Sequence, residues 1–403
     1  MGILDLFRGS KDERMAKRVM SDRRAAGETR RMEFDAEKLA VVTFDADGSR
    51  AAIQNLAHLK NTLENGDTRE HDAAYQQLVN SWRESLSPAP KTYAEARPML
   101  RVAMRDPAYR ERTRLFGRSA DHSDPVKPLA ARIFAGDIAA YGVLDRQFGI
   151  DFVTDEQVAG WGVTPAQVLD DALANTQAMT FTTESANSLY FIMGPDSYNV
   201  SCLACTDAIR KLPLKGLPVA AAATRDSLSI TGSDDLAGLE LLARVLEAEL
   251  KGGTRHVSGR PLVLTESGWQ PFEPPASLEE RFLTIARQYD VMFWTDYQEL
   301  LQKDLESRDE DIFVASLAHY EDSADASTFT LVTWSAGVDT ILPPADRVGF
   351  YDDETKLTRV AMWADVQRVM GAGMQQMEGF PLRYRVQVFP TDGELLEMGA
   401  KKI

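Results

Sequence analysis

Two cysteines three positions apart form the spacing in this chain that most directly suggests chemistry. Cys202-Leu-Ala-Cys205 is a C-x-x-C motif, and such a pair is redox active when a helix N-terminus lowers the pKa of the first thiol. The same pair would be half of a zinc site, which needs two further ligands. The five histidines lack metal-ligand spacing, and Val200, Leu203 and Ala204 surround the pair with apolar groups. The pattern favours buried packing cysteines, and no metal ion is expected.

A second group of polar residues lies where a strand is expected to meet a helix, at Asp196, Tyr198 and Ser201. Asp196 can cap the helix by accepting hydrogen bonds from its free N–H groups, and Ser201 can bond back to a carbonyl. Arg225 and Asp226 stand between two apolar runs that are expected to pair as strands. These five residues are candidates either for capping or for a ligand pocket at a helix N-terminus, which would suit an anion.

The common catalytic motifs are missing from the sequence. It contains no G-x-S-x-G nucleophile elbow and neither of the usual glycine-rich phosphate loops. Carboxylate doublets such as Asp170-Asp171 follow from an acidic composition, and adjacent side chains on a helix point apart. One enzymatic alternative stays open, a hydrolase with a dispersed acidic site made by Asp196, Asp226 and Tyr198. Spacing along the sequence does not tell whether these three converge.

The charge balance excludes one class of partner. The chain has 403 residues with 45 Lys and Arg against 61 Asp and Glu, a net charge of −16. General nucleic-acid binding depends on basic side chains that neutralise phosphates, so no nucleic-acid partner is expected. Two cysteines are too few for a disulfide framework, which indicates a reducing, cytoplasmic setting. No apolar run approaches the roughly 18 residues of a membrane-spanning helix.

The first 31 residues differ in charge from the remainder, with nine Lys or Arg against five acidic residues. An apolar start at Ile3, Leu4, Leu6 and Phe7 precedes this basic stretch. Such a segment can lie on an anionic membrane surface, and peripheral membrane association through residues 1–31 stays open. The short apolar stripe favours instead a leading helix that packs on its own domain.

Turn signals and hydrophobic periodicity divide the chain into three domains, 1–116, 129–275 and 276–403. The polar segment 117–128 has the composition of a linker. Short apolar runs joined by hairpin-like links alternate with amphipathic helices in all three domains. This strand-strand-helix order predicts an α+β fold of two or three packed subdomains, with a basic leading helix, rather than a doubly wound parallel sheet.

The same signals place individual elements. Helices are expected at 53–63, 69–86, 198–212, 234–250 and 360–370, the fourth of them capped by Asp234. Capping boxes are expected at Thr154 and Ser277. Strands are expected at 39–44, 138–144, 150–153, 189–193, 219–223, 228–231, 312–317 and 329–334.

Short motifs of the second domain carry a resemblance to a known family. They are the segment from Trp161-Gly-Val-Thr164 to Ala172-Leu-Ala-Asn175, the pair Tyr190-Phe191, the run Asp196-Ser-Tyr198-Asn-Val-Ser201-Cys-Leu203 and the strand pair around Asp226. Over roughly 130–275 the chain resembles the YtpQ-like bacterial family, a domain of unknown function. Val200 departs from the family, which usually has alanine there. The resemblance implies a shared fold and a bacterial cytosolic setting, but no reaction and no common redox role for Cys202 and Cys205.

We therefore expect a non-enzymatic interaction or regulatory protein of the bacterial cytoplasm that needs no cofactor. The acidic composition and three tryptophans of the third domain, Trp294, Trp334 and Trp363, are compatible with a protein partner. The sequence does not indicate the oligomeric state.

Overall fold

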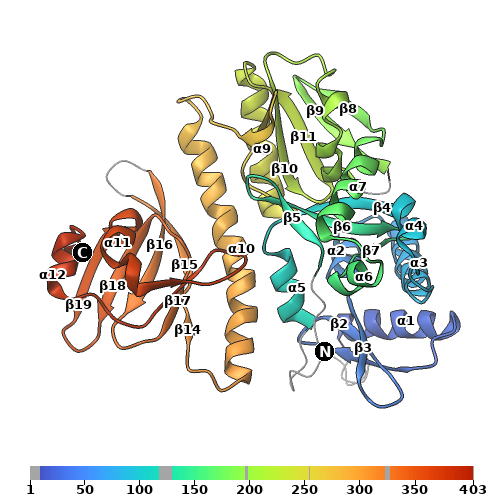
Figure 1. Cartoon of the computed structure of the whole chain (residues 1–403), viewed down its shortest axis with the longest axis horizontal. Coiled ribbons are helices and arrows are strands. Elements are labelled where there is room, and N and C mark those ends of the chain that lie inside the picture. The colour runs from blue at the N-terminus through green and yellow to red at the C-terminus, as the bar shows by residue number, and fades with distance from the viewer. Residues whose placement is uncertain (1–9, 118–128, 196–197, 254, 323–326, 403) are drawn as a thin grey trace, which may run out of the picture. The chain divides into compact units, whose positions relative to one another are not determined.

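The computed structural model describes residues 10–117, 129–195, 198–253, 255–322 and 327–402 (Figure 1). Contacts within the chain define two compact units, which are described separately. The first unit comprises Met1–Arg101, Phe116–Ala130 and Gly142–Ala172, and the second comprises Val102–Leu115, Ala131–Tyr141 and Leu173–Ile403. Apart from residue 117, the predicted linker lies outside the described residues. The division into three domains stays a prediction.

A small antiparallel sheet and three helices form the N-terminal part of the first unit. The sheet order is β1-β2-β3, from β1 (Arg31–Asp35), β2 (Ala40–Phe44) and β3 (Arg50–Asn55), and the helices are α1 (Lys11–Ala25), α2 (Ala57–Asn65) and α3 (Thr68–Ser85). The apolar residues Met15, Ala16 and Val19 of α1 are buried in one core with Val41 and Leu59. The apolar face of the basic leading helix is thus covered by its own unit, while residues 1–9 lie outside the described residues.

The expected helix at 53–63 begins later than predicted. Ile53 lies in β3, where it pairs with Val42 of β2, and α2 starts at Ala57. The spacing of Ile53 and Leu56 fits a helix, but pairing with the neighbouring strand decides the conformation. The expected helix at 69–86 is confirmed as α3.

Short strands and helices follow in the next part of the chain. They are α4 (Tyr93–Ala96), β4 (Leu100–Arg105), α5 (Tyr109–Gly117), β5 (Ala131–Ala135), β6 (Ile138–Asp145), β7 (Ile150–Phe152), α6 (Asp155–Gly160) and α7 (Pro165–Gln177). One sheet has the order β4-β6-β5, with β7 beside β6. The capping box at Thr154 is confirmed, because its side chain accepts from Gln157 N and its own N–H donates to the Gln157 side chain.

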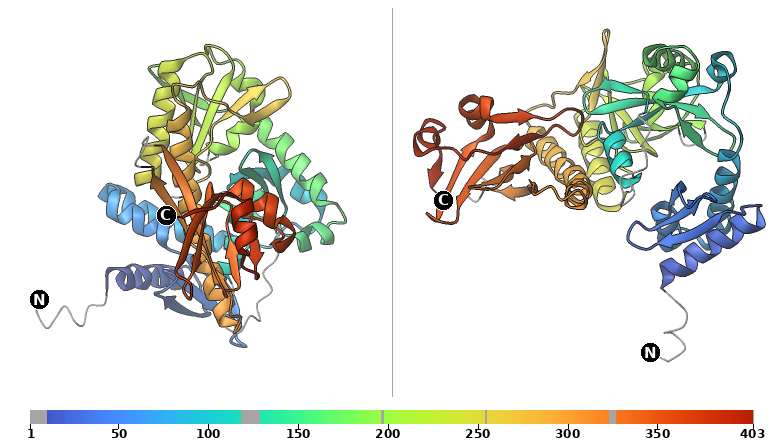
Figure 2. Two further views of the ribbon diagram at one scale, coloured as in Figure 1. Left: turned by 90° about the vertical axis from the view of Figure 1, so that its left-hand side faces the viewer. Right: turned by 60° about the horizontal axis from the view of Figure 1, so that its bottom comes forward.

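A six-stranded antiparallel sheet is the centre of the second unit. Its strands are β8 (Thr182–Ala186), β9 (Leu189–Met193), β10 (Pro218–Thr224), β11 (Ser227–Gly232), β12 (Leu262–Thr265) and β13 (Gly268–Pro271), in the order β13-β12-β10-β11-β9-β8. Helix α9 (Leu236–Gly252) packs Leu239, Leu242 and Leu246 against Val219 and Ala221 of β10 (Figures 1 and 2). Alternate β10 residues are small or β-branched, so the helix lies close to the strand.

Two local predictions in this region are wrong. The N-cap of α9 is Asp235 rather than Asp234, and its carboxylate accepts from Gly238 N at 3.2 Å. The expected helix at 198–212 is instead a 3₁₀ turn at Val200–Ala204 followed by the short α8 (Thr206–Ile209). The periodic apolar residues of this stretch are buried by the surrounding strands rather than by one continuous helix.

The long helix α10 (Glu279–Ser307) is followed by two further sheets. One has the order β15-β16-β18-β19-β22, from β15 (Leu317–Glu321), β16 (Thr328–Ser335), β18 (Arg347–Asp352), β19 (Leu357–Met362) and β22 (Lys401–Lys402). The other has the order β14-β17-β21-β20, from β14 (Phe313–Val314), β17 (Thr340–Leu342), β21 (Tyr384–Val386) and β20 (Met374–Gln376). Helices α11 (Trp363–Met370) and α12 (Asp392–Glu397) complete the chain.

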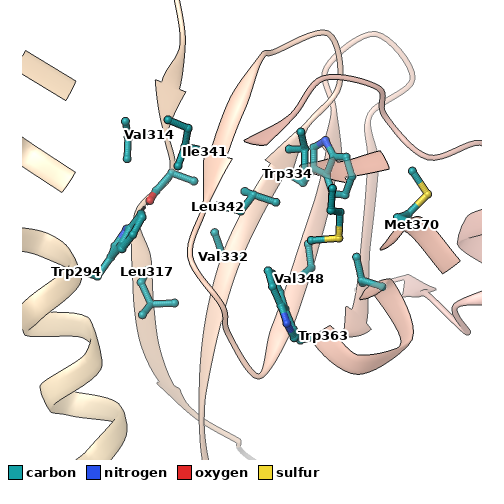
Figure 3. Packing of buried hydrophobic residues seen from close by; sticks show 14 of the residues in the cluster. Trp294, Val314, Leu317, Val332, Trp334, Ile341, Leu342, Val348, Trp363 and Met370 are labelled. Carbon is teal, nitrogen blue, oxygen red and sulfur yellow. Dashed lines mark hydrogen bonds between the residues drawn. The ribbon is translucent and has the colours of Figure 1, made fainter. Parts of the chain in front are cut away.

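The three tryptophans of this region belong to its core. Trp294, Trp334 and Trp363 are 3%, 1% and 9% exposed, which makes them packing residues rather than a surface for a partner. Figure 3 shows Trp294 on α10 beside Val314 and Leu317 of the strands. The indole N–H of Trp294 donates to Ala315 O at 2.7 Å, so the polar edge of this ring is satisfied inside the core.

Three further predictions for this region need correction. No capping box forms at Ser277, because α10 has Leu278 at its N-cap with no side-chain hydrogen bond there. Residues 360–362 belong to β19, and the helix starts at Trp363. The single strand expected at 312–317 is divided between β14 and β15, which lie in different sheets.

The small, mostly antiparallel sheets with helices packed on them confirm the predicted α+β fold class. Two pairs of the described strands are parallel, β14 with β17 and β16 with β18. Among the described helices, none is long and apolar enough to cross a membrane.

Candidate anion-binding site

Three arginines from separate segments of the second unit lie near one another, and two of them face one tyrosine. Arg105 is the last residue of β4, Arg225 lies in the tight turn between β10 and β11, and Arg255 follows α9. The guanidinium carbons of Arg225 and Arg105 lie 5.0 and 5.8 Å from the centre of the Tyr109 ring. Guanidinium groups stack favourably on such rings, and the tyrosine therefore holds two of the three charges in place.

The backbone fixes Arg255 beside Arg225. Arg225 N donates to Arg255 O at 3.1 Å, and the neighbouring residues Thr224 and His256 form a β-bridge. Arg255 has a φ of +61°, a left-handed conformation that is uncommon for a residue with a side chain. This backbone strain is of a kind that concentrates at functional sites.

Burial and repulsion between like charges both lower the pKa values of arginines in this cluster. Burial, followed by the nearby charges of Arg225 and Arg255, lowers the pKa of Arg105 to about 9. Burial also lowers the pKa of Arg225, and the charge of Arg255 adds to the effect. With a pKa of about 9, Arg105 still carries its proton at neutral pH. The protein therefore holds several poorly hydrated positive charges close together, which a bound anion would stabilise.

The carboxylates near the cluster already have partners. Asp226 accepts a hydrogen bond from Arg255, and Asp106 is held by Arg112 through two bonds of 2.9 and 2.8 Å. Asp296 on α10 interacts electrostatically with Arg112. The site consequently has a surplus of arginines in a chain whose net charge is −16. The excess of positive charge is local and contrary to the composition.

This arrangement is suited to binding an oxyanion. The planar guanidinium fork matches carboxylate and phosphate oxygens, and such charge-assisted bonds are stronger than neutral ones. The nearest histidine, His256, has its Nε2 at 2.9 Å from the backbone oxygen of Glu249. That contact directs Nε2 to the backbone, and the three arginines supply the positive charge of the site.

The residues predicted from the strand-to-helix junction have mainly architectural contacts. Ser201 is buried and its Oγ accepts from Met104 N at 3.3 Å, next to Arg105 at the end of β4. Tyr198 is only 5% exposed. Asp196 lies outside the described residues, so the hydrolase alternative with Asp196, Asp226 and Tyr198 stays a prediction.

One asparagine links this junction to the hairpin that carries Arg225. Asn199 accepts from Gly194 N at 2.9 Å and donates to Asp226 O at 2.7 Å. A Cβ at Gly194 would lie 2.7 Å from Cys202 Sγ and 3.0 Å from Tyr198 O, which explains a glycine there. Of the predicted candidates, the structure thus connects Ser201, Arg225 and Asp226 to one region.

The two cysteines are free and buried, with exposures of 0% and 2%. The hydrogen bond with Cys205 and burial both raise the pKa of Cys202, which disfavours the reactive thiolate. Cys205 Sγ lies 3.4 Å from Thr176 O, where it acts as a weak donor. These contacts are those of packed thiols.

Sequence reasoning missed Arg105, Tyr109 and Arg255. Arg105 ends an apolar strand that was not predicted, and Arg255 follows the glycines that terminate α9. An arginine at the end of an apolar strand or after a helix is a sequence signal for a functional residue. Only the fold brings the end of β4 and the segment after α9 together.

In the described ranges, no group of three or more His, Cys, Asp or Glu residues is placed to hold a metal ion. No family model, curated protein or solved structure matches the chain. The YtpQ-like resemblance therefore stays a prediction from the motifs alone.

Proposed function

We propose that the protein is a non-enzymatic binding protein that holds a small oxyanion-bearing ligand on Arg105, Arg225 and Arg255. The observation that carries this proposal is a cluster of three guanidinium groups in an otherwise acidic chain, two of them poorly hydrated and facing the Tyr109 ring. The absence of the common catalytic motifs from the sequence favours binding over turnover. This is the interaction or regulatory role expected from the sequence, now with a ligand class.

The net charge limits the size of the ligand. A charge of −16 repels long polyanions at a distance, whereas a single phosphate or carboxylate meets mainly the local field of the cluster. We place the protein in the cytoplasm on its cysteine content, as part of the same proposal.

Phosphate and carboxylate share the chemistry that the cluster recognises, and titration separates them. Unfolding midpoints of the full chain would be measured with inorganic phosphate, acetate and chloride at equal ionic strength. We expect phosphate or acetate to raise the midpoint and chloride to leave it unchanged, because specific binding stabilises only the folded state.

Arg225→Gln is the decisive variant, and Arg281→Gln is its matched control. Arg281 lies in the same unit, where it pairs with Glu247 on α9. Loss of one charge-assisted hydrogen bond should weaken anion binding by about tenfold or more in R225Q, but not in R281Q. An equal response of both variants and the unmodified chain to every anion would refute the proposal.

Asp226→Asn gives a test with the opposite sign. The Asp226 carboxylate occupies Arg255, and its removal should free that guanidinium and tighten anion binding several-fold. A role of the cluster in folding alone would not produce tighter binding.

A further inference from the structure

A cavity of about 450 Å³ lies elsewhere in the second unit. Its wall is mostly apolar and is formed on one side by α10 and on the others by loops and strand ends. The apolar lining includes Phe293, Trp294, Leu317, Pro343, Phe380 and Leu382. Its volume falls within the range of sites for small organic molecules. None of the three arginines of the anion proposal lines this cavity, although Asp106, which follows Arg105, does.

One end of the cavity is polar. Asp137, Arg260 and Asp290 line it, and Ser258 Oγ donates to the Asp137 carboxylate at 2.6 Å. Gly259 brings this segment against α10, because a Cβ there would lie 2.5 Å from the Tyr289 ring. Ser258 and Arg260 are thus part of a tightly packed loop.

The guanidinium of Arg260 binds the carboxylate of Asp290 more closely than that of Asp137. Arg260 forms two bonds of 2.7 and 2.5 Å to Asp290, but reaches Asp137 only at 3.4 Å. Burial raises the pKa of Asp137, which marks a carboxylate whose negative charge is incompletely compensated. The third lining carboxylate, Asp106, is held by Arg112 through two bonds. The unbalanced negative charge therefore resides at Asp137.

The apolar part offers an accessible surface beside this charge. Phe380 and Leu382 are 47% and 38% exposed although they are large and apolar. Trp294 and Leu317 belong to the buried core that Figure 3 shows. The N–H of Trp294 is already bonded to Ala315 O, so the ring adds apolar surface and no free donor.

We propose that this cavity binds a small organic cation, with its ammonium group on Asp137 and its apolar or aromatic body against Phe380, Leu382 and Phe293. Charge complementarity selects this ligand class. Asp137 would repel an anion, and a neutral apolar molecule would leave this carboxylate with Arg260 at 3.4 Å as its counter-charge. Aromatic rings near the carboxylate add a favourable surface for a cation.

The test uses three probes that share one phenyl body. These are 2-phenylethylammonium, 2-phenylethanol and 3-phenylpropionate, titrated against the full chain by calorimetry and ligand-observed NMR. We expect the cation to bind at least tenfold more tightly than the alcohol. The anion should bind only at the arginine cluster, so that R225Q weakens its binding and F380A does not. Equal affinity of the cation and the alcohol would overturn the proposal.

Variants then locate the site. Asp137→Asn should lower cation affinity at least tenfold, whereas Asp207→Asn, an exposed carboxylate on α8, should leave it unchanged. Phe380→Ala removes an exposed ring and should weaken both the cation and the alcohol without affecting folding. If D137N fails to fold, unchanged cation binding by F380A refutes the site. R225Q should keep full cation affinity, which separates this proposal from the anion site.

Discussion

Arg23 in the first unit and Arg105 in the second are both strongly buried, at 1% and 9% exposed. Burial is the largest cause that lowers the pKa of each. Their neighbours differ. Arg23 donates to Glu28 at 3.0 Å and to Thr43 at 2.9 Å, and Glu28 is also held by Arg30. Arg105 has Arg225 and Arg255 nearby, and the repulsion from these two charges lowers its pKa further.

The charge of the neighbouring groups, and not an unbonded nitrogen, distinguishes the two buried arginines. The Nε atoms of Arg23 and Arg225 are both buried without a hydrogen-bond partner, so an unbonded nitrogen alone does not distinguish the two regions. The difference lies in charge. In the first unit one carboxylate lies between two arginines, and in the second unit arginines are gathered around a tyrosine. The first arrangement holds its own counter-charge in Glu28, whereas the second is the one that the proposed anion would stabilise.

The largest expected effect follows removal of the carboxylate in the first unit. Glu28→Gln leaves Arg23 buried with its charge uncompensated, and this should lower the free energy of unfolding by about 3–5 kcal/mol. Chemical denaturation at neutral pH measures the change.

Glu33→Gln is the matched control, because Glu33 pairs with Arg31 on the surface, with side chains 55% and 58% exposed. An exposed pair contributes less than about 1 kcal/mol. A similar loss in both variants would remove the contrast between buried and exposed pairs.

Protonation of Glu28 at low pH should also destabilise the folded protein. Hydrogen bonds from Arg30, followed by one from Arg23, lower the pKa of Glu28 to about 2 from 4.5. Its folded pKa is below its unfolded pKa, so its contribution is fully present above pH 4.5 and is lost as the pH falls toward 2. The contribution is about 3 kcal/mol at most. Unfolding at pH 7, 4 and 3 should show a steeper acid loss in the unmodified chain than in E28Q, and parallel curves would contradict this.

The sequence predicted the fold class and several helices and strands because these depend on local periodicity. The β10–β11 hairpin, α3 and α9 follow directly from apolar spacing. Errors arose where long-range pairing decided the outcome, as at Ile53 in β3 and at residues 360–362 in β19. The sequence does not distinguish Asp235, the N-cap of α9, from Asp234, because both are aspartates directly before the helix.

The candidate site was predicted only in part for a related reason. Arg225 and Asp226 stood out because they interrupt a predicted hairpin. Arg105 and Arg255 are 120 and 30 residues from Arg225 in the sequence, and only the sheet and the loop after α9 bring them together. Sequence spacing contains no information about such convergence.

A smaller effect is expected at the residue that anchors the end of β4. Ser201→Ala leaves the buried Met104 N–H without its acceptor, which should cost about 1–2 kcal/mol of unfolding free energy. Ser277→Ala is the control, since Ser277 is exposed and makes no cap for α10. Thermal unfolding compares the two. An equal decrease in the free energy of unfolding for both variants would mean that the hydrogen bond from Met104 N to Ser201 does not specifically stabilise the end of β4.

The smallest expected effect has the opposite sign and bears most directly on the comparison. Arg225→Gln relieves repulsion with Arg105 and Arg255, so without added anion the free energy of unfolding should stay equal or rise by about 1 kcal/mol. Arg281→Gln, which breaks a pair with Glu247, should lower it slightly. Denaturation in a buffer free of multivalent anions measures both. With saturating phosphate or acetate, whichever of the two binds, the order should reverse, because only a chain with the complete cluster gains stability from the ligand. If R225Q is destabilised by several kcal/mol in the absence of anion, Arg225 resembles Arg23 as a structural charge, and the distinction between the two regions fails.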